Sequence, residues 1–256
     1  MTRAVPKLLA ISDPHERVRL GLCGDGDTGA PLEAACRRWL RSLIDAGVDT
    51  VQLREGSGKP GGLDDRRVLE LATALVDEAH RHGPPTIRVV INGRADIALA
   101  SGAAGVHLPA AGVPVAALRR RFGDRLLIGK STHHPDEVRQ ARADGADYVT
   151  FGPVFPTPSK AGYGPPPGLE GLAEASRHGS TAPESTEPGS TEPGFSVLAL
   201  GGVDADRIDA IQIAGAHGVA GIRTFHEPEA LERIATAARR AWPNAVRSTA
   251  STPSRL

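Results

Sequence analysis

The feature that most constrains the fold of this chain is a regular alternation of short apolar runs with longer helical segments. Most of the apolar runs are followed by a segment with apolar residues three or four positions apart, as in 31–47, 65–83 and 227–242. The apolar runs themselves lie at 8–12, 50–55, 88–92, 105–109, 126–131, 148–154, 196–202 and 218–222. Strands that are apolar on both faces and alternate with helices are typical of a parallel sheet covered by its crossover helices.

The number of these units predicts how the sheet closes. Eight strand and helix units in a chain of 256 residues predict an α/β fold, a single (β/α)8 TIM barrel over 1–245. An open, doubly wound parallel sheet is the alternative. Glycines that follow the predicted helices, as the residues just past a helix end would, are Gly47, Gly83, Gly102, Gly145 and Gly215.

Two polar segments depart from the pattern. Residues 177–194 contain STEPG twice and no large apolar side chain, so burial cannot offset the entropy of ordering them. We expect a disordered low-complexity insertion there. The equally polar segment 246–256 is expected to be a flexible tail.

Composition narrows the class of partner. Lys plus Arg and Asp plus Glu number 30 each, giving a formal net charge of zero, so neither nucleic acid nor an anionic membrane is an expected partner. Only two cysteines occur, Cys23 and Cys36, which fits a reducing compartment. The run 8–11 is too short for a secretion signal, and no run approaches the roughly 20 apolar residues of a membrane span. We therefore expect a cytoplasmic protein, and the sequence leaves a homo-oligomer open.

Two loops after late strands carry glycines and hydroxyl groups in a pattern that indicates a phosphate ligand. The sixth predicted strand leads into FPTPSK, and the seventh ends in Gly201 and Gly202, which we expect to open the following helix. Such loops bind phosphate because backbone N–H groups converge there with no Cβ in the way. The backbone of Ile222 and Arg223, after the eighth strand, is expected to converge on the same phosphate. The Arg223 guanidinium either binds it or lies in solvent.

Six sequence blocks occur in order between residues 8 and 240: VQLRE, INGRADIALASGAAGVHLP, LLIGKSTHH, DGADYVTFGPVFPTPSK, LALGGV and AGAHGVAGI. In order and spacing they resemble the thiamine-phosphate synthase and thiazole tautomerase family. The resemblance implies a (β/α)8 barrel, a small phosphorylated thiazole as ligand, and a site at the C-terminal ends of the strands.

The synthase branch of the family joins a pyrimidine methyl diphosphate to thiazole phosphate. Its members resemble one another in a Gln-x-Arg-x-Lys block, an Asn-Asp pair and a further Asp, the two Asp residues holding Mg²⁺ for the departing diphosphate. In this chain the resemblance assigns substrate binding to Gln52, Arg54 and Asn92.

Three charged residues of that synthase pattern are missing. The Lys of the first block is replaced by Gly56, and the two Mg²⁺-binding Asp positions read Gly93 and Gly112. Lys59 is the nearest candidate for the lost Lys, and Asp96 is the nearest carboxylate, although we expect Asp96 to contact structure rather than a metal.

The fifth predicted strand ends in two residues that the resemblance places in the site, Ser131 and His133. In the tautomerase branch a histidine at the position of His133 moves a proton on the thiazole ring, a task that needs no metal. We expect His134 to face solvent. His107 belongs either to the inner layer of the barrel or to the site.

The loop after the sixth strand supplies further expected contacts with the ligand. Thr157, Ser159 and Lys160 match the family's hydroxyl-rich loop, where hydroxyl groups and an ammonium would hold an anionic substrate. Lys160 is the second catalytic candidate beside His133.

These residues favour a metal-independent, thiazole tautomerase-like enzyme without a cofactor. Proton transfer keeps the groups that it needs, whereas diphosphate displacement has lost three charged groups. The first alternative is a thiamine-phosphate synthase with relocated ligands for a Mg²⁺ cofactor. The second is a non-catalytic protein that binds thiazole phosphate.

Overall fold

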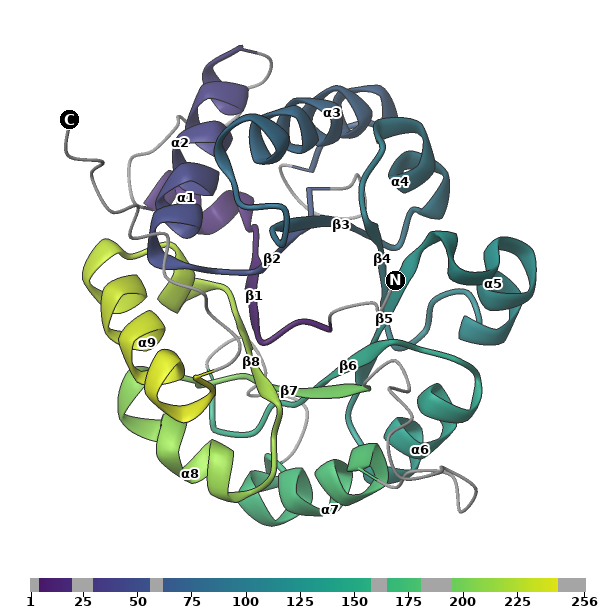
Figure 1. The fold of residues 1–256 in the computed structure, drawn as a ribbon, viewed down its shortest axis with the longest axis vertical. Helices are drawn as coiled ribbons and strands as arrows, with labels where there is room; N and C mark the ends of the chain where they lie inside the picture. Colours follow the sequence, from purple (N-terminus) through teal and green to yellow (C-terminus); the bar gives the residue numbers. More distant parts are fainter. Residues whose placement is uncertain (1–4, 20–29, 56–61, 158–164, 181–194, 244–256) are drawn as a thin grey trace, which may run out of the picture.

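The computed structural model describes residues 5–19, 30–55, 62–157, 165–180 and 195–243. Its strands form a closed parallel barrel in sequence order, and β1 pairs with β8 to close the ring. Figure 1 shows the strands as a central ring inside a layer of helices. The strands are β1 Leu8–Ile11, β2 Thr50–Leu53, β3 Arg88–Asn92, β4 Gly105–Leu108, β5 Leu127–Thr132, β6 Tyr148–Phe151, β7 Ser196–Leu200 and β8 Gly218–Gly221. The closure confirms the predicted TIM barrel and excludes the open doubly wound sheet.

The outer layer consists of the connecting helices. The helices are α1 Pro14–Arg19, α2 Ala30–Ala46, α3 Asp65–His82, α4 Ala95–Ser101, α5 Val115–Phe122, α6 Pro135–Ala143, α7 Gly168–Ser180, α8 Ile208–Ile213 and α9 Pro228–Ala241. Short 3-10 turns are η1 Gly123–Arg125, η3 Ala205–Arg207 and η4 Arg223–Phe225. In α2 the apolar residues spaced three or four apart, Leu32, Cys36, Leu40 and Leu43, are all buried, as their spacing predicts. Within the described ranges, we find no helix long and apolar enough to cross a membrane.

The strands contribute to two separate cores. Their outward side chains, such as Val51, Val89 and Val149, pack under the helices. Their inward side chains fill the barrel with a second core of Leu9, Ile11, Val90, Leu127, Tyr148, Leu198 and Ala220. Because both faces of each strand are buried, the strands read as continuous apolar runs. The filled interior leaves the ends of the barrel as the places where a ligand can bind.

Helix α7 ends later than the sequence pattern predicts. It continues to Ser180, past the start of the expected insertion at residue 177. The Arg142 guanidinium of α6 lies 3.2 Å from the carbonyl oxygen of His178 and 3.0 Å from that of Gly179, so a distant residue satisfies the last carbonyls of the helix. Residues 181–194 and the predicted tail lie outside the described residues.

All five glycines lie just past a helix end, as predicted, and four of them have the left-handed conformation. Positive φ angles occur at Gly47, Gly102, Gly145 and Gly215. Gly83 instead has a φ of −94°. A Cβ on Gly83 would lie 2.3 Å from Cγ2 of Ile87, so glycine is needed there for close packing and not for a left-handed turn.

Candidate active site

The inward side chains at the carboxyl ends of the strands form a layer that we call the floor. They follow the inner core on the same side of each strand, because side chains alternate along a strand. The floor consists of Ile11, Gln52, Asn92, His107, Ser131, Thr150, Leu200 and Ile222. It is polar from β2 to β6 and apolar on β7, β8 and β1.

Two predicted ligand-binding residues meet on the β2–β3 side of the floor. Gln52 Nε2 donates a hydrogen bond to Asn92 Oδ1 at 2.8 Å. Gln52 is 2% exposed, and its Oε1 atom has no hydrogen-bond partner among the described residues. A buried acceptor without a partner costs free energy, so this atom is a place where a ligand donor would be stabilised. Oγ1 of Thr150, also buried, is a second such atom.

His107 is the residue that β4 contributes to the floor, and its side chain is buried. It is 2% exposed, its Nε2 is 2.9 Å from Ser131 Oγ, and its Nδ1 is 3.2 Å from the Tyr148 hydroxyl. Burial lowers the pKa of His107 to about 3, and the positive charges of Lys130 and Arg54 act in the same direction. His107 thus contacts the inner core on one side and the predicted site residue Ser131 on the other.

His133 is held in one orientation at the end of β5. Its backbone N–H donates to the Glu137 carboxylate at 2.6 Å, and its Nδ1 is hydrogen-bonded to the carbonyl oxygen of Gly152. Because a carbonyl oxygen only accepts, Nδ1 carries the hydrogen and Nε2 of the neutral ring is left as a proton acceptor. This is the arrangement that a general base requires. His134 is exposed, as predicted.

The turn after β7 presents backbone N–H groups. Its carbonyl oxygens all accept hydrogen bonds from protein donors. The donor and acceptor pairs are Val154 N to Leu200 O, Phe155 N to Gly201 O, Arg207 Nη1 to Gly202 O and Thr224 Oγ1 to Val203 O. The N–H groups of Gly201 and Gly202 have no acceptor in the described part of the chain. With its carbonyls engaged elsewhere, the turn has the character of an anion-binding nest, which we call the cradle.

The cradle is made by positive φ angles and not by a helix N-terminus. Gly201 and Gly202 have φ angles of 95° and 63°. The prediction that they open the following helix was wrong, because helical turns begin only at Ala205, where the Asp204 carboxylate accepts from Arg207 N. A Cβ on Gly201 would lie 3.4 Å from Cγ2 of Thr157, so the structure brings this predicted residue beside the cradle.

Arg54, at the end of β2, uses some of its hydrogen-bond donors for contacts within the protein. Its guanidinium pairs with the Asp13 carboxylate, and its backbone N–H donates to Ser12 Oγ at 2.8 Å. Its Nε is buried and has no hydrogen-bond partner among the described residues, while 24% of the side chain is exposed. The positive charge of Arg54 is one of the causes that lower the pKa of His107, a residue of the floor. The guanidinium therefore retains donors for an anion.

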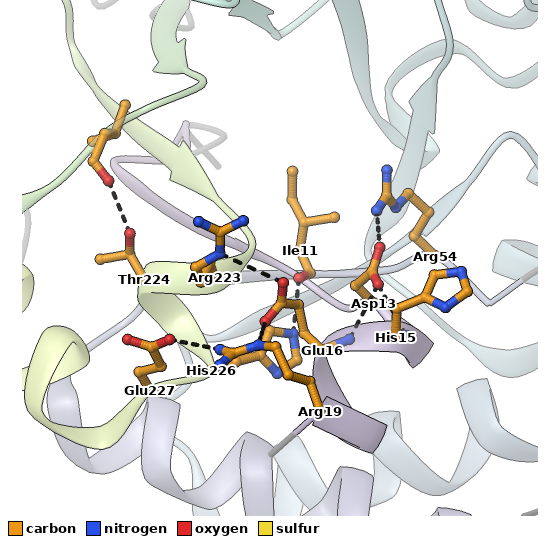
Figure 2. Close-up of polar contacts among 11 residues, drawn as sticks. Ile11, Asp13, His15, Glu16, Arg19, Arg54, Arg223, Thr224, His226 and Glu227 are labelled. Carbon is orange, nitrogen blue, oxygen red and sulfur yellow. Dashed lines mark hydrogen bonds and ion pairs between the residues drawn. The ribbon is translucent and has the colours of Figure 1, made fainter. Parts of the chain in front are cut away.

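Arg223 faces the outer layer. Figure 2 shows its guanidinium directed at Glu16 of α1, with Nε 3.6 Å from Oε1. The same α1 places Arg19 between Glu16 and Glu227, at 2.7 and 2.6 Å. The Arg223 side chain is 59% exposed, and with Asp206 and other residues of η3, η4 and α9 it lines a surface cavity of about 280 Å³. The structure therefore favours a surface role for this side chain.

Two residues that contact arginines of the site were not predicted from the sequence, and four residues named from the sequence lie outside the described ranges. Asp13 and Glu16 were missed, although acidic residues directly after the first strand could have indicated partners for arginines at neighbouring strand ends. The predicted Ser159 and Lys160, together with Gly56 and Lys59, lie outside the described residues.

Several known proteins are similar to this chain over most of its length. A family model described as thiamine monophosphate synthase matches residues 25–225. A protein of Geobacter sulfurreducens named putative thiamine-phosphate synthase is 39% identical over 88% of this chain and 90% of its own length. The chain belongs to the thiamine monophosphate synthase family. A thiamine-phosphate synthase of Gloeobacter violaceus is 43% identical over 72% of this chain and 47% of its own length.

A solved structure supports the fold of this family member. The thiamine phosphate pyrophosphorylase of Pyrococcus furiosus has a TM-score of 0.66 to this chain, with 23% sequence identity, over 92% of this chain and 96% of its own. At this identity the likeness shows the shared barrel.

The family's Mg²⁺ ligands have no counterpart at their expected positions in this member. Gly93 and Gly112 carry no carboxylate, and Asp96 is engaged by Arg94, whose hydrogen bond lowers the pKa of the Asp96 carboxyl. The Lys130 ammonium, 2.8 Å from the Pro109 carbonyl oxygen, occupies acceptors of the loop that leads to Gly112. The described residues contain no group of three or more potential metal ligands. They therefore do not fit a Mg²⁺ site of the family's kind.

Proposed function

We propose that this protein is a thiamine-phosphate synthase that joins a pyrimidine methyl diphosphate to a thiazole phosphate. The observation that carries the proposal is that binding groups occur in two separate places on one barrel mouth. The cradle lies at β7 with Thr157 beside it, and the Gln52–Asn92 pair lies at β2 and β3. Two such places suit an enzyme that joins two substrates. The relatives named thiamine-phosphate synthase, 35–43% identical to this chain, support the same activity.

In this proposal each place binds one substrate. The cradle holds the phosphate of the thiazole, whose ring rests on the apolar part of the floor. The pyrimidine, with an exocyclic amino group and ring nitrogens, pairs with Gln52 Oε1 and the Asn92 amide. The thiazole nitrogen forms a bond to the pyrimidine methylene carbon as the carbon–oxygen bond breaks, and diphosphate leaves with the bonding electrons. Arg54 donates hydrogen bonds to the negative charge that develops on the departing group.

The test is an assay of the purified protein with thiazole phosphate and pyrimidine methyl diphosphate, with and without Mg²⁺. We expect thiamine phosphate to form. If the protein only isomerises thiazole tautomers, the proposal fails in favour of a tautomerase. If thiazole phosphate binds and neither reaction proceeds, the protein is a non-catalytic binder.

We expect no saturable Mg²⁺ binding to the protein alone. Positions 93 and 112 lack carboxylates, and Mg²⁺ loses its water reluctantly without them. Any Mg²⁺ in the reaction would then be held by the substrate diphosphate. Titration calorimetry of the protein with Mg²⁺ checks this expectation. A saturable site that is lost in Asp96→Asn would contradict it, and Asp77→Asn, on the outer helix α3 where 57% of the side chain is exposed, serves as the control for a general loss of acidic charge.

A thiazole tautomerase is the second candidate, and the orientation of His133 favours it. The sequence alone placed this activity first, whereas the names of the relatives favour the synthase. If His133 moves a proton, His133→Asn should lower tautomer turnover about 100-fold. An asparagine amide can still donate to the Gly152 carbonyl, so the substitution removes Nε2 and leaves the local contact. Kinetics of His133→Asn and of the exposed control His134→Asn measure this. A parallel loss of phosphate affinity would indicate a binding role instead.

A further inference from the structure

Tyr148 of β6 has an unusual environment for a phenol. It is fully buried in the inner core, and His107 is its only hydrogen-bond partner in the part of the chain that the structure describes. The facing residue of β5 is Gly129, where a Cβ would lie 2.5 Å from the Tyr148 hydroxyl oxygen and 2.1 Å from Cζ. The missing side chain at Gly129 therefore makes the space that the phenol occupies.

The hydrogen atoms in this cluster can be assigned from its contacts. His107 is neutral, because burial lowers its pKa to about 3, so one ring nitrogen carries a hydrogen. If Nδ1 carried it, the hydroxyl hydrogen of Tyr148 would have no acceptor among the described residues, and a buried unpaired donor is costly. Tyr148 therefore donates to Nδ1, and Nε2 carries the hydrogen. His107 then donates to Ser131 Oγ at 2.9 Å.

We propose that Tyr148 and His107 are positioning residues that make Ser131 a hydrogen-bond donor to the ligand. Ser131 Oγ accepts from His107 below, and its own hydroxyl hydrogen has no acceptor among the described residues. The free hydroxyl hydrogen of Ser131 accordingly favours a hydrogen-bond acceptor as the ligand atom over it, such as a ring nitrogen or an anionic oxygen. The inference rests on the proposed function only in placing a ligand on the floor.

We call the hydrogen bonds from Tyr148 to His107 and from His107 to Ser131 the relay. Its direction can be measured without any turnover. Nitrogen-15 NMR of the full-length protein at neutral pH should show His107 with its hydrogen on Nε2, and the signal is assigned by its loss in His107→Gln. Tyr148→Phe removes only the donor to Nδ1. In this variant the form of His107 with its hydrogen on Nε2 should no longer be favoured over the form with its hydrogen on Nδ1. A His107 ring with its hydrogen on Nδ1 in the unaltered protein would overturn the relay. This result is independent of the activity, so it separates failure of the relay from failure of the proposed function.

The effect on the ligand is tested by combining two substitutions. When Ser131 is present, Tyr148→Phe should lower kcat/KM for thiamine phosphate formation about tenfold. Without the Tyr148 hydroxyl, Ser131 can turn and donate its hydrogen to His107 and no longer to the ligand. In the Ser131→Ala background the same change should have less than about a twofold effect. His107→Gln, which keeps an N–H donor toward Ser131, should lose less activity than His107→Ala, which removes the donor. Equal losses from Tyr148→Phe with and without Ser131 would overturn the proposal.

A matched control separates positioning from general loss of packing. Thr132, the next residue of β5, is buried and faces the outer core, where its hydroxyl donates to the Thr150 carbonyl at 3.0 Å. Thr132→Val removes a buried hydroxyl from the same strand without touching the relay. We expect it to change the melting temperature as much as Tyr148→Phe does and to leave kcat/KM within about twofold. A tenfold loss in Thr132→Val would mean that packing, and not the relay, sets the activity.

Discussion

Arg54→Gln is expected to lower kcat for thiamine phosphate formation about 100- to 1,000-fold while leaving the affinity for thiazole phosphate within a few-fold. The guanidinium is anchored by Asp13 on one side and has a buried Nε without a partner on the other, so it is poised for an anion. Loss of one such preorganised donor typically costs this much in rate. Thiazole phosphate is expected to bind at the cradle, which the substitution does not touch. Steady-state kinetics and calorimetry give the two quantities.

Two variants show whether the effect belongs to Arg54 itself. Arg223→Gln removes an arginine from another strand end, where it is mostly exposed and paired with Glu16, and should reduce kcat less than about threefold. Asp13→Asn keeps the charge of Arg54 and weakens only its anchor, so an intermediate loss is expected. If Arg223→Gln is as damaging as Arg54→Gln, the departing diphosphate lies on the β8 side of the mouth, and the placement of the two substrates is wrong.

The barrel could be predicted because its signals are local. Each strand is buried on both faces by neighbours that the fold always supplies, so apolar runs such as 88–92 and 196–202 mark strands regardless of their partners. The end of α7 could not be predicted, because Arg142 of another helix satisfies its carbonyls. A helix end that depends on a residue far away in sequence leaves no pattern near the end itself.

In the candidate site, too, residues with a local sequence signal could be predicted, whereas roles that depend on distant residues could not. Gln52, Asn92 and Ser131 were identified from family blocks, and their positions at strand ends bring them to one floor. The roles of Arg54 and Arg223 depend on Asp13 and Glu16, two residues of the β1–α1 segment whose contacts are set by the closed ring. The relay from Tyr148 also depends on the empty position at Gly129, and a glycine in a strand does not reveal by itself which ring fills its space.

Gly201→Ala is expected to lower the free energy of unfolding by about 4 kcal/mol and to weaken thiazole phosphate binding at least tenfold. The φ of 95° disfavours any residue with a Cβ, and that Cβ would lie 2.7 Å from Cα of Pro153, which is backbone and cannot turn away. Backbone strain and overpacking each cost about 1–3 kcal/mol. Relief of the contact would separate the β6 and β7 loops, which the hydrogen bond from Phe155 N to Gly201 O joins at 3.1 Å, and would displace the cradle.

Gly168→Ala is the matched control for this last prediction. Gly168 begins α7 with a φ of 67°, and a Cβ there would meet nothing within 4 Å. It therefore imposes the backbone strain without the collision, and we expect a loss of about 1–2 kcal/mol with unchanged phosphate binding. Denaturant unfolding and calorimetry with thiazole phosphate measure both variants. If Gly201→Ala destabilises the barrel but binds thiazole phosphate as tightly as the unaltered protein, the phosphate is held elsewhere, because a nest made by two glycine N–H groups cannot keep its geometry once their turn has moved.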